Sequence, residues 1–387
     1  MIRNISIGID LGSTTTRIVV GEFLKGEKNP KIIGTGEAET RGVRHGYVVD
    51  VPKAVSSLKN AVALAEKSSG VKIRRAFIGV GGVTLRGDMA NGVGIISKAD
   101  GEVTSLDINK ALEDCEDNLN LNNKKIIKIV PVSFKLDGKE ILGRPEGMRG
   151  TKLEIKALFV TCSLSHFEDL LEVVTLAGIE PVDVIASPLS GSHIAISGRQ
   201  KIVGSALVNI GSETVSLGVF ENNTLISLHT FSIGGADITN DIALGMKVSL
   251  ENAERYKLGN MGEEFSKKKL EEIIEARLFD IFELIENHFK KIKRSELLPA
   301  GVIFIGGGAN ISMLEEFSKS ALKLPSKVGS TDMFGNIKTK LRDPAWFTVL
   351  GLIMSPDNNE HYLRGSFKSF FKNIENILKS NIKQLMP

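Results

Sequence analysis

The hydrophobic pattern begins with residues 5–20, two runs rich in β-branched residues that are joined by Gly12-Ser13-Thr14. Such runs on either side of a turn made of glycine and hydroxyl residues are typical of a β-hairpin. A second arrangement of run, turn and run occurs at residues 206–220, with Gly211 in its turn. The chain therefore contains an internal duplication, and we expect two related halves.

Around the two hairpins the pattern changes between strands and helices. The expected strands are 31–40, 76–80, 181–185 and 301–305, and the expected helices are 52–68, 164–177, 188–197 and one that begins near Met313. Residues 346–354 are predicted to be the last core segment. Stretches rich in Lys and Glu favour helices up to about Arg294. Within them, one buried stripe is formed by Leu278, Ile281, Phe282, Ile285 and Phe289.

The order of the predicted strands and helices differs between about residues 83 and 160. This segment predicts, in order, a strand at 93–97, a helix at 106–119 and strands at 126–136 and 153–160. We interpret it as a small αβ unit inserted into the first half.

The end of the chain has a strongly amphipathic pattern. Large apolar residues at helical spacing are Phe367, Phe370, Phe371, Ile374, Ile377, Leu378, Ile382 and Leu385. The lysines Lys368, Lys372, Lys379 and Lys383 accompany them, against the single acidic residue Glu375. An apolar face beside basic residues is typical of a helix that lies in the membrane interface. The alternative is a terminal helix packed on the protein's own core, which the polar linker before it disfavours.

Composition narrows the possible functions. A chain of 387 residues is long enough for two or three cores. The net charge of +3 gives no case for nucleic-acid binding. The chain has two cysteines, Cys115 and Cys162, and its six histidines lack metal-ligand spacing. No run of 18 apolar residues occurs, and no signal peptide precedes the first strand, so we expect a reduced, cytoplasmic protein with at most peripheral membrane contact.

The two hairpin turns carry the candidate chemistry. Around Asp10, the first turn offers glycine for close backbone approach, together with N–H and hydroxyl donors that suit phosphate. The second turn, residues 209–214, can do the same from the other half. Two such turns facing each other would hold the phosphates of a nucleotide between two domains. The alternative is that each is only a tight turn.

A third glycine cluster, Gly306 to Gly308, follows the strand at 301–305, where a ribose and base could pass against bare backbone. In this order the three loops resemble the nucleotide site of the superfamily of actin, hexokinase and DnaK-type chaperones. The resemblance implies bound ATP and Mg²⁺, with Asp10 holding the metal through water. The residues that it places at the nucleotide are Asp10, Gly12, Ser13, Thr14, Thr15, Arg17, Asn209, Gly211, Ser212, Glu213, Thr214, Gly234, Gly235, Glu254, Lys257, Gly306, Gly307, Gly308 and Asn310.

Within that superfamily the chain resembles the cell-division protein family FtsA. The resemblance rests on Arg41-Gly42-Val43 with Gly46 and residues 48–50, on the inserted unit, and on residues 147–150. Segments 157–162, 178–181 and 186–188 are also similar to FtsA, but the pilus-assembly protein PilM shares them in looser form. PilM is therefore the alternative, and a small-molecule kinase of the superfamily is a more distant one.

The resemblance implies an α/β, actin-like fold of two domains with duplicated ribonuclease-H-like subdomains around a nucleotide cleft. The implied subdomains are 1–82 with 161–197, the insert 83–160, 198–236 with 300–355, the helical outer subdomain 237–299, the linker 356–365 and the membrane helix 366–387. The implied function is to polymerise at the cytoplasmic face of the membrane at the division site. There the protein would tether FtsZ filaments through the outer subdomain and help to recruit later division proteins.

Two departures from the superfamily pattern bear on turnover. The second phosphate loop has Asn209 where an Asp usually helps to hold the magnesium waters. Relatives that hydrolyse ATP place a Gln or Glu at the start of the helix after the first domain's last strand, where this chain has Ala186-Ser187-Pro188. We therefore expect at most weak ATPase activity, with the nucleotide acting mainly as a structural or regulatory ligand.

Overall fold

The first hairpin forms the middle of a five-stranded sheet in the computed structural model, which describes residues 4–27, 29–260, 266–331, 333–334 and 339–354. The strands of this sheet lie in the order β11-β6-β1-β2-β3. They are β1 (Asn4–Leu11), β2 (Thr15–Phe23), β3 (Lys31–Glu39), β6 (Arg75–Val80) and β11 (Glu180–Ala186). β6 and β11 run parallel to β1, so the carboxyl ends of three strands meet at one edge.

The second hairpin forms the equivalent sheet, in the order β14-β13-β12-β15-β16. Its strands are β12 (Ser205–Ile210), β13 (Val215–Glu221), β14 (Thr224–Phe231), β15 (Val302–Ile305) and β16 (Ser326–Val328). Both sheets have three antiparallel strands followed by two parallel ones. The hairpin registers also match, because Leu11 pairs with Thr16 and Ile210 pairs with Val215. The predicted duplication is therefore confirmed.

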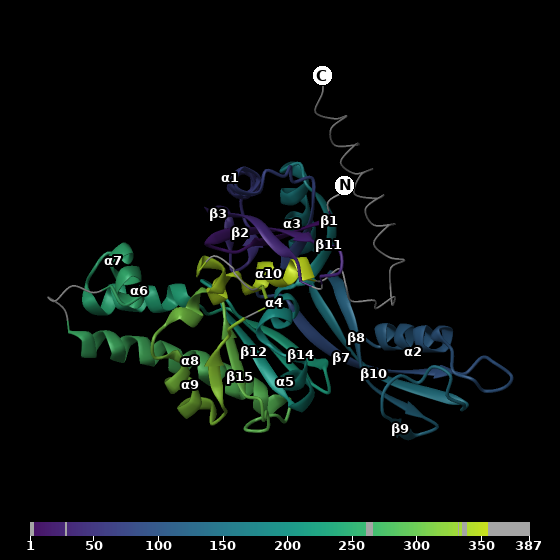
Figure 1. The fold of residues 1–387 in the computed structure, drawn as a ribbon. Coiled ribbons are helices and arrows are strands. Elements are labelled where there is room, and N and C mark those ends of the chain that lie inside the picture. The colour runs from purple at the N-terminus through teal and green to yellow at the C-terminus, as the bar shows by residue number, and fades with distance from the viewer. Residues whose placement is uncertain (1–3, 28, 261–265, 332, 335–338, 355–387) are drawn as a thin grey trace. The chain divides into compact units, whose positions relative to one another are not determined.

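Two helices lie between the sheets, α4 (Ser187–Ala195) and α10 (Phe347–Met354) (Figure 1). Helix α4 follows β11 of the first half and packs on β12 and β15 of the second. Helix α10 follows residues 344–346 of the second half and packs on β1, β2 and β6 of the first. A Cβ atom at Gly191 of α4 would lie 2.4 Å from Ile305 Cδ1, and one at Gly8 of β1 would lie 2.7 Å from the Val349 oxygen of α10. The helices themselves touch, since a Cβ at Gly351 would lie 1.9 Å from the Ser190 oxygen. The two halves are therefore joined by helices that pack closely at glycine residues, where no side chain separates the backbones.

The opposite face of the first sheet is covered by α1 (Val51–Ser69) and α3 (Leu164–Leu176). Asp50 caps α1 by accepting a hydrogen bond from the Lys53 amide, and Pro52 occupies its first turn. These helices confirm the predicted segments 52–68 and 164–177 to within one residue at either end.

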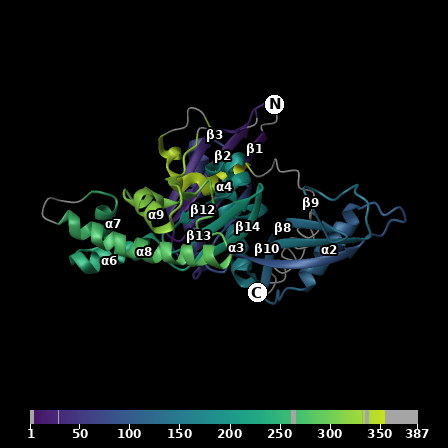
Figure 2. The same ribbon diagram turned by 90° about the horizontal axis from the view of Figure 1, so that it is seen from below.

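The inserted unit has its own sheet, in the order β7-β10-β8-β9, with α2 (Ser105–Asp117) across one face (Figure 2). Its strands are β7 (Arg86–Ile95), β8 (Lys124–Leu136), β9 (Lys139–Ile141) and β10 (Lys152–Ser163). The predicted strand 93–97 was too short, because β7 begins at Arg86. Ala90, Gly92 and Gly94 lie in β7, and a Cβ at Gly92 would lie 2.2 Å from the Ala111 oxygen of α2. These small residues let the helix approach, and they also weaken the strand signal in the sequence.

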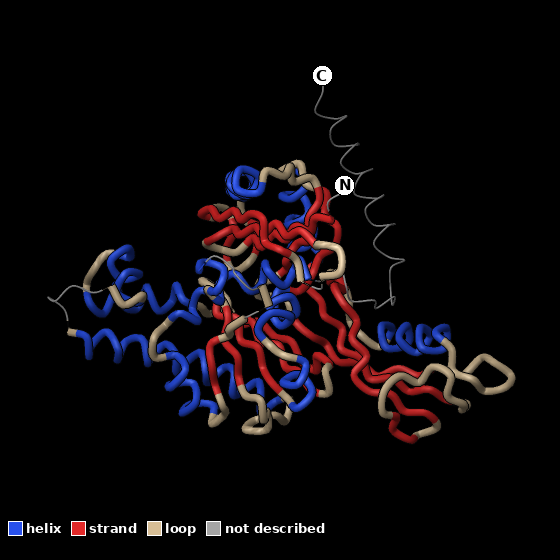
Figure 3. The backbone as a smooth tube through the Cα atoms, in the orientation of Figure 1, coloured by secondary structure: helices blue, strands red, loops and turns tan. Residues whose placement is uncertain are grey.

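The second half continues into helices, which Figure 3 separates by colour from the three larger sheets. They are α6 (Gly235–Met246), α7 (Leu250–Lys257), α8 (Lys267–Lys291) and α9 (Leu314–Leu322). All five residues of the predicted stripe on α8 are buried. Short elements that the sequence did not predict include α5 (Gly198–Val203) and the two-residue strands β4 (Val43–Arg44) and β5 (Tyr47–Val48).

The chain divides after Met354 into two units, of which residues 355–387 form the second. The predicted linker and membrane helix lie there, outside the described residues. Among the helices that are described, none is both long and apolar enough to cross a bilayer.

Candidate functional site

The two phosphate turns have the same internal geometry. In the first, the Gly12 amide donates to the Thr15 oxygen at 3.3 Å, and in the second the Gly211 amide donates to the Thr214 oxygen at 2.9 Å. The next main-chain amides, those of Ser13, Thr14, Ser212 and Glu213, donate to no other residue in the described part of the chain. Each turn thus presents two main-chain N–H groups that could donate hydrogen bonds to an anion, as in phosphate-binding nests.

Asp10 lies at the carboxyl edge of the first sheet, paired in register with Gly79 of β6. A Cβ atom at Gly79 would lie 3.2 Å from Asp10 Oδ1 and 3.5 Å from Ser187 Oγ, so these three residues meet at one point. The Asp10 carboxylate accepts no hydrogen bond from another described residue. Loss of solvation on burial raises its pKa to about 6, against a smaller lowering by the charge of Arg17. A carboxylate with a raised pKa and no hydrogen-bond partner among the described residues is a candidate functional group.

Asn209 takes the position in the second half that Asp10 takes in the first. Its amide donates to Thr348 Oγ1 of α10 at 3.4 Å, and its oxygen lies beside Gly306. Gly306 has φ +88°, and a Cβ there would lie 2.3 Å from Asn209 Oδ1. A Cβ at Gly308 would lie 2.3 Å from Ile210 Cγ2. Backbone conformation and packing therefore require glycine at 306, and packing requires it at 308.

Gly307 differs from its neighbours. A Cβ added there meets no atom within 4 Å, and its φ lies outside the left-handed region. The fold itself does not require glycine at this position. Open space at the middle of a glycine loop is consistent with the prediction that a ligand passes close to the backbone there.

Gly234 and Gly235 join the second phosphate turn to helix α6. The Gly235 amide donates to the Gly211 oxygen at 2.9 Å, and the Ala236 amide donates to the Ser212 oxygen at 2.7 Å. A Cβ at Gly234 would lie 2.4 Å from the Ser212 oxygen. The start of α6 is thereby fixed against the turn.

The outer pair, Glu254 and Lys257, lies at the same helix start. The Lys257 ammonium, on a side chain 8% exposed, donates to Glu254 Oε2 (2.6 Å), Thr239 Oγ1 (2.8 Å) and the Gly235 oxygen (3.0 Å). These contacts use all three of its N–H donors. Lys257 therefore braces the turn, and contact with a ribose or adenine would require it to exchange one of these bonds.

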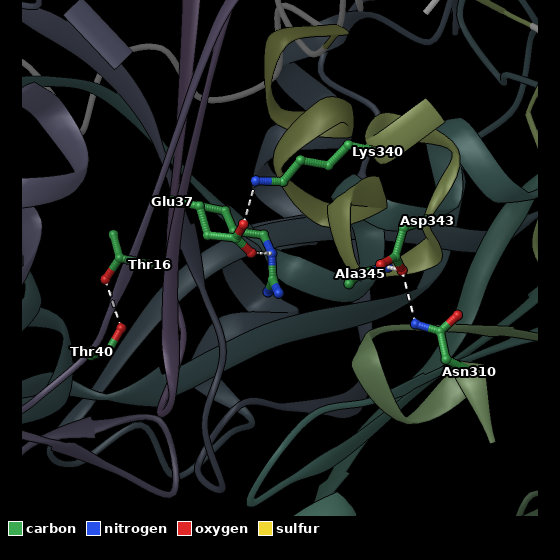
Figure 4. Close-up of polar contacts among 8 residues, drawn as sticks. Thr16, Glu37, Thr40, Asn310, Lys340, Asp343 and Ala345 are labelled. Carbon is green, nitrogen blue, oxygen red and sulfur yellow. Dashed lines mark hydrogen bonds and ion pairs between the residues drawn. The ribbon is translucent and has the colours of Figure 1, made fainter. Parts of the chain in front are cut away.

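The glycine loop is also linked to the first half, through residues 339–346 (Figure 4). Asn310 donates to Asp343 Oδ1 at 3.0 Å, and Lys340 of the same segment forms an ion pair with Glu37 of β3 at 2.5 Å. Glu37 in turn accepts a hydrogen bond from Arg17 of β2 at 3.1 Å. The cationic groups of Arg17 and Lys340 lie 5.6 and 4.8 Å from the ring centroid of Trp346, which is buried. Arg17, predicted at the nucleotide, is thus held mainly by Glu37 and Trp346.

A second link between the halves comes from the turn of β4 and β5, which the sequence singled out only as a family feature. The Gly46 amide donates to Ser13 Oγ at 3.0 Å. The neighbouring His45 amide donates to Glu213 Oε2, and Arg44 Nε lies 2.9 Å from Glu213 Oε1. Arg44 and His45 were missed because their partner lies about 170 residues away in sequence, where no local pattern indicates it.

Two duplicated sheets, crossed helices between them and three loops at their meeting point define the actin-like, two-domain class. Among solved structures, a PilM–PilN type IV pilus biogenesis complex matches 90% of this chain and 97% of its own at a TM-score of 0.69 and 14% identity. MreB5 of Spiroplasma citri bound to ADP matches 96% and 98% at a TM-score of 0.55 and 12% identity. At these identities the likeness shows the fold alone, and the predicted fold class is confirmed.

Sequence comparison identifies the family. The model of cell division protein FtsA matches residues 206–351, and that of the SHS2 domain inserted in FtsA matches residues 84–161. Cell division protein FtsA of Bacillus subtilis is 30% identical over 369 residues, 90% of this chain and 82% of that protein. The Pseudomonas aeruginosa protein of the same name is 26% identical over 90% and 88%. The chain belongs to the FtsA family of cell-division proteins, as its resemblance predicted.

Proposed function

We propose that the chain binds ATP with Mg²⁺ between its two phosphate turns. The observation that carries this proposal is that four unused main-chain amides, two from each half, lie in geometrically equivalent turns linked by residues 44–46. Ser13, Thr14, Ser212 and Glu213 would hold the phosphates through these amides. Gly306 to Gly308 would face the ribose and base.

The residues also fit a magnesium ion. Mg²⁺ is usually held by one or two carboxylates, by substrate phosphates and by several waters. Asp10 offers one carboxylate that accepts no hydrogen bond from the residues that the structure describes, and Asn209, at the equivalent position of the second half, has an amide in place of a carboxylate. Bound there, Mg²⁺ would neutralise phosphate charge, and Asp10 would orient it through water.

The nucleotide would act mainly as a ligand that favours one arrangement of the halves. Ser187, the residue at the start of α4, lies beside Asp10, and Ala186 and Pro188 flank it. None of the three carries the carboxylate or amide that orients an attacking water in hydrolytic relatives. We therefore propose slow turnover.

The substitution Gly307→Trp tests nucleotide binding. Because a side chain at 307 enters open space, the fold should survive while the indole occupies the path proposed for the adenosine. The matched control is Gly198→Trp on α5, where a Cβ also meets nothing within 4 Å. Isothermal calorimetry with Mg²⁺-ATP should show binding by the parent and the control and none by Gly307→Trp. Equal affinity in all three proteins would show that adenosine does not lie on this loop.

At the cellular level we propose that the protein polymerises at the inner face of the cytoplasmic membrane. There it would tether FtsZ filaments and help to recruit later division proteins. Support comes from the family, from the inserted SHS2 unit and from the amphipathic pattern of residues 366–387. One interfacial helix is a modest anchor, because anionic lipid contributes about 1 kcal/mol per basic residue. Polymerisation would place many tails at high effective concentration and so make the attachment strong.

The proposed contact with FtsZ lies on the helical outer subdomain. A surface pocket of about 470 Å³ lies where α8 of this subdomain meets α9 and residues 312–313 of the second actin-like subdomain. It is lined by Glu271, Glu275, Ser312, Met313, Glu316, Phe317 and Ser320. Apolar residues and three carboxylates in this lining suit a peptide that carries both apolar and basic side chains. Sedimentation of FtsZ with anionic vesicles should require the full chain and should be lost on Met313→Glu, with Leu142→Glu on the inserted unit as the exposed control.

A further inference from the structure

The turn between β4 and β5 has an unusual backbone. Arg44 pairs with Tyr47, and the two residues between them, His45 (φ +50°) and Gly46 (φ +79°), both lie in the left-handed region. Two such residues define the type I′ turn of a tight hairpin. Left-handed conformations are uncommon outside glycine, and histidine is one of the residues that adopt them more readily than most.

The turn is fixed to the first half. A Cβ at Gly46 would lie 2.3 Å from the Gly82 Cα atom, so the two backbones are in direct contact. The Val83 amide donates to the His45 oxygen at 3.3 Å, and the Tyr47 ring lies 4.8 Å from the ring of His166 on α3. These contacts attach the turn firmly to the first half.

On its other side the turn holds one residue of the second half, Glu213, in three ways. Arg44 Nε pairs with Oε1 at 2.9 Å, and the His45 amide donates to Oε2. His45 Nδ1 lies 3.2 Å from the main-chain oxygen of Glu213 and 3.3 Å from Ser232 Oγ, so the imidazole also faces the second half. The Glu213 side chain is 17% exposed and that of Arg44 is 69% exposed. Glu213 is thus a largely buried carboxylate within the turn proposed for phosphate, and Arg44 is the cationic side chain that pairs with it.

The negative charge of Glu213 would affect phosphate binding in this turn. A carboxylate next to a terminal phosphate repels it, and at an effective dielectric constant of about 20 the repulsion persists over several ångströms. ATP places one more phosphate between the turns than ADP does. The penalty from an unneutralised Glu213 would therefore fall more heavily on ATP.

We propose that Arg44 determines the preference of the site for ATP over ADP by neutralising Glu213 and holding it against the first half. This inference rests on the proposed nucleotide site. The Gly46 amide donates to Ser13 Oγ in the first phosphate turn. Residues 44–46 therefore contact both phosphate turns. Closure of the halves and acceptance of the terminal phosphate then depend on the same three-residue turn.

The test measures dissociation constants for Mg²⁺-ATP and Mg²⁺-ADP by calorimetry in the full chain. Arg44→Ala should weaken ATP binding at least tenfold more than ADP binding. Arg44→Lys, which keeps the charge, should retain most of the preference. Glu213→Gln in the Arg44→Ala background should restore the ratio, because the repelling charge is gone. The matched control is Arg41→Ala, which removes an exposed arginine of the same segment that pairs with Glu39.

Circular dichroism spectra should be alike in the four variants, because Arg44 and Arg41 are both exposed and Glu213→Gln keeps the size and shape of the side chain. A parent protein that binds neither nucleotide would overturn the proposed function and this inference with it. If the parent binds both and Arg44→Ala weakens them equally, or not at all, the proposed function stands and the role of Arg44 is wrong. Failure of Glu213→Gln to restore the ratio would likewise refute neutralisation as the mechanism.

Discussion

Replacing Asp10 by Asn should stabilise the protein without nucleotide, and the gain should grow with pH. Burial raises the pKa of Asp10 from its ordinary 3.8 to about 6. As pH rises from 3.8 to 6, the unfolded chain ionises Asp10 while the folded chain keeps the proton, so folding loses stability. At about 1.4 kcal/mol per pH unit, the loss reaches about 3 kcal/mol above pH 6. Asn cannot ionise and avoids this cost.

The assay is urea unfolding at pH 4.5, 6 and 8 without nucleotide, followed by the fluorescence of Trp346, the single tryptophan of the chain. Linkage predicts that Asp10→Asn is more stable than the parent by about 1 kcal/mol at pH 4.5 and about 3 kcal/mol at pH 8. The same change at the exposed Asp117 controls for removing one surface charge. Because packing effects of Asn do not vary with pH, only the pH dependence counts. A constant difference from pH 4.5 to 8 would refute the reasoning.

Three further predictions concern turnover, membrane and core. Because of Asn209 and the absence of a water-orienting side chain at residues 186–188, filaments should release phosphate more slowly than about 1 per second, the lower end of typical enzyme rates; a faster rate in a phosphate-release assay would contradict this. Phe370→Glu combined with Phe371→Glu should leave the chain in the supernatant of sedimented anionic vesicles while it still binds ATP, and pelleting like the parent would remove the main support for a membrane tether. Trp346→Ala should cost about 3 to 5 kcal/mol of unfolding free energy, because it empties a buried site that two cations flank; a loss below about 1 kcal/mol by circular dichroism would show that this packing contributes little.

Local pattern determined most of the secondary structure. The β-branched runs of the two hairpins are visible in the sequence because these strands are buried on both faces, and the stripe on α8 is visible because one face of that helix is buried. The duplication followed from the same runs, whereas the family resemblance rested on residues 41–50, the inserted unit and residues 147–150. Elements that were missed lack such a signal. β4 and β5 are two residues each, and β7 is rich in glycine because α2 packs closely on it.

The role of each predicted site residue became visible only in the folded chain. Gly306 and Gly308 look alike in sequence to Gly307, yet the first two are required by contacts with Asn209 and Ile210, and only Gly307 faces open space. Lys257 looks like a nucleotide ligand, yet its ammonium is used up at the start of α6. Such roles depend on atoms from distant segments that meet only after folding.

The link between Arg44 and Glu213 shows the same limit most clearly. The sequence did not single out Arg44, and it gave Glu213 only as one of the residues that the resemblance places at the nucleotide. An ion pair between residues so far apart leaves no periodicity or spacing along the chain, since it arises only when the crossed helices α4 and α10 bring the two halves together. Residue pattern was therefore enough for the elements, the duplication and the family, while folding determined which charges neutralise each other.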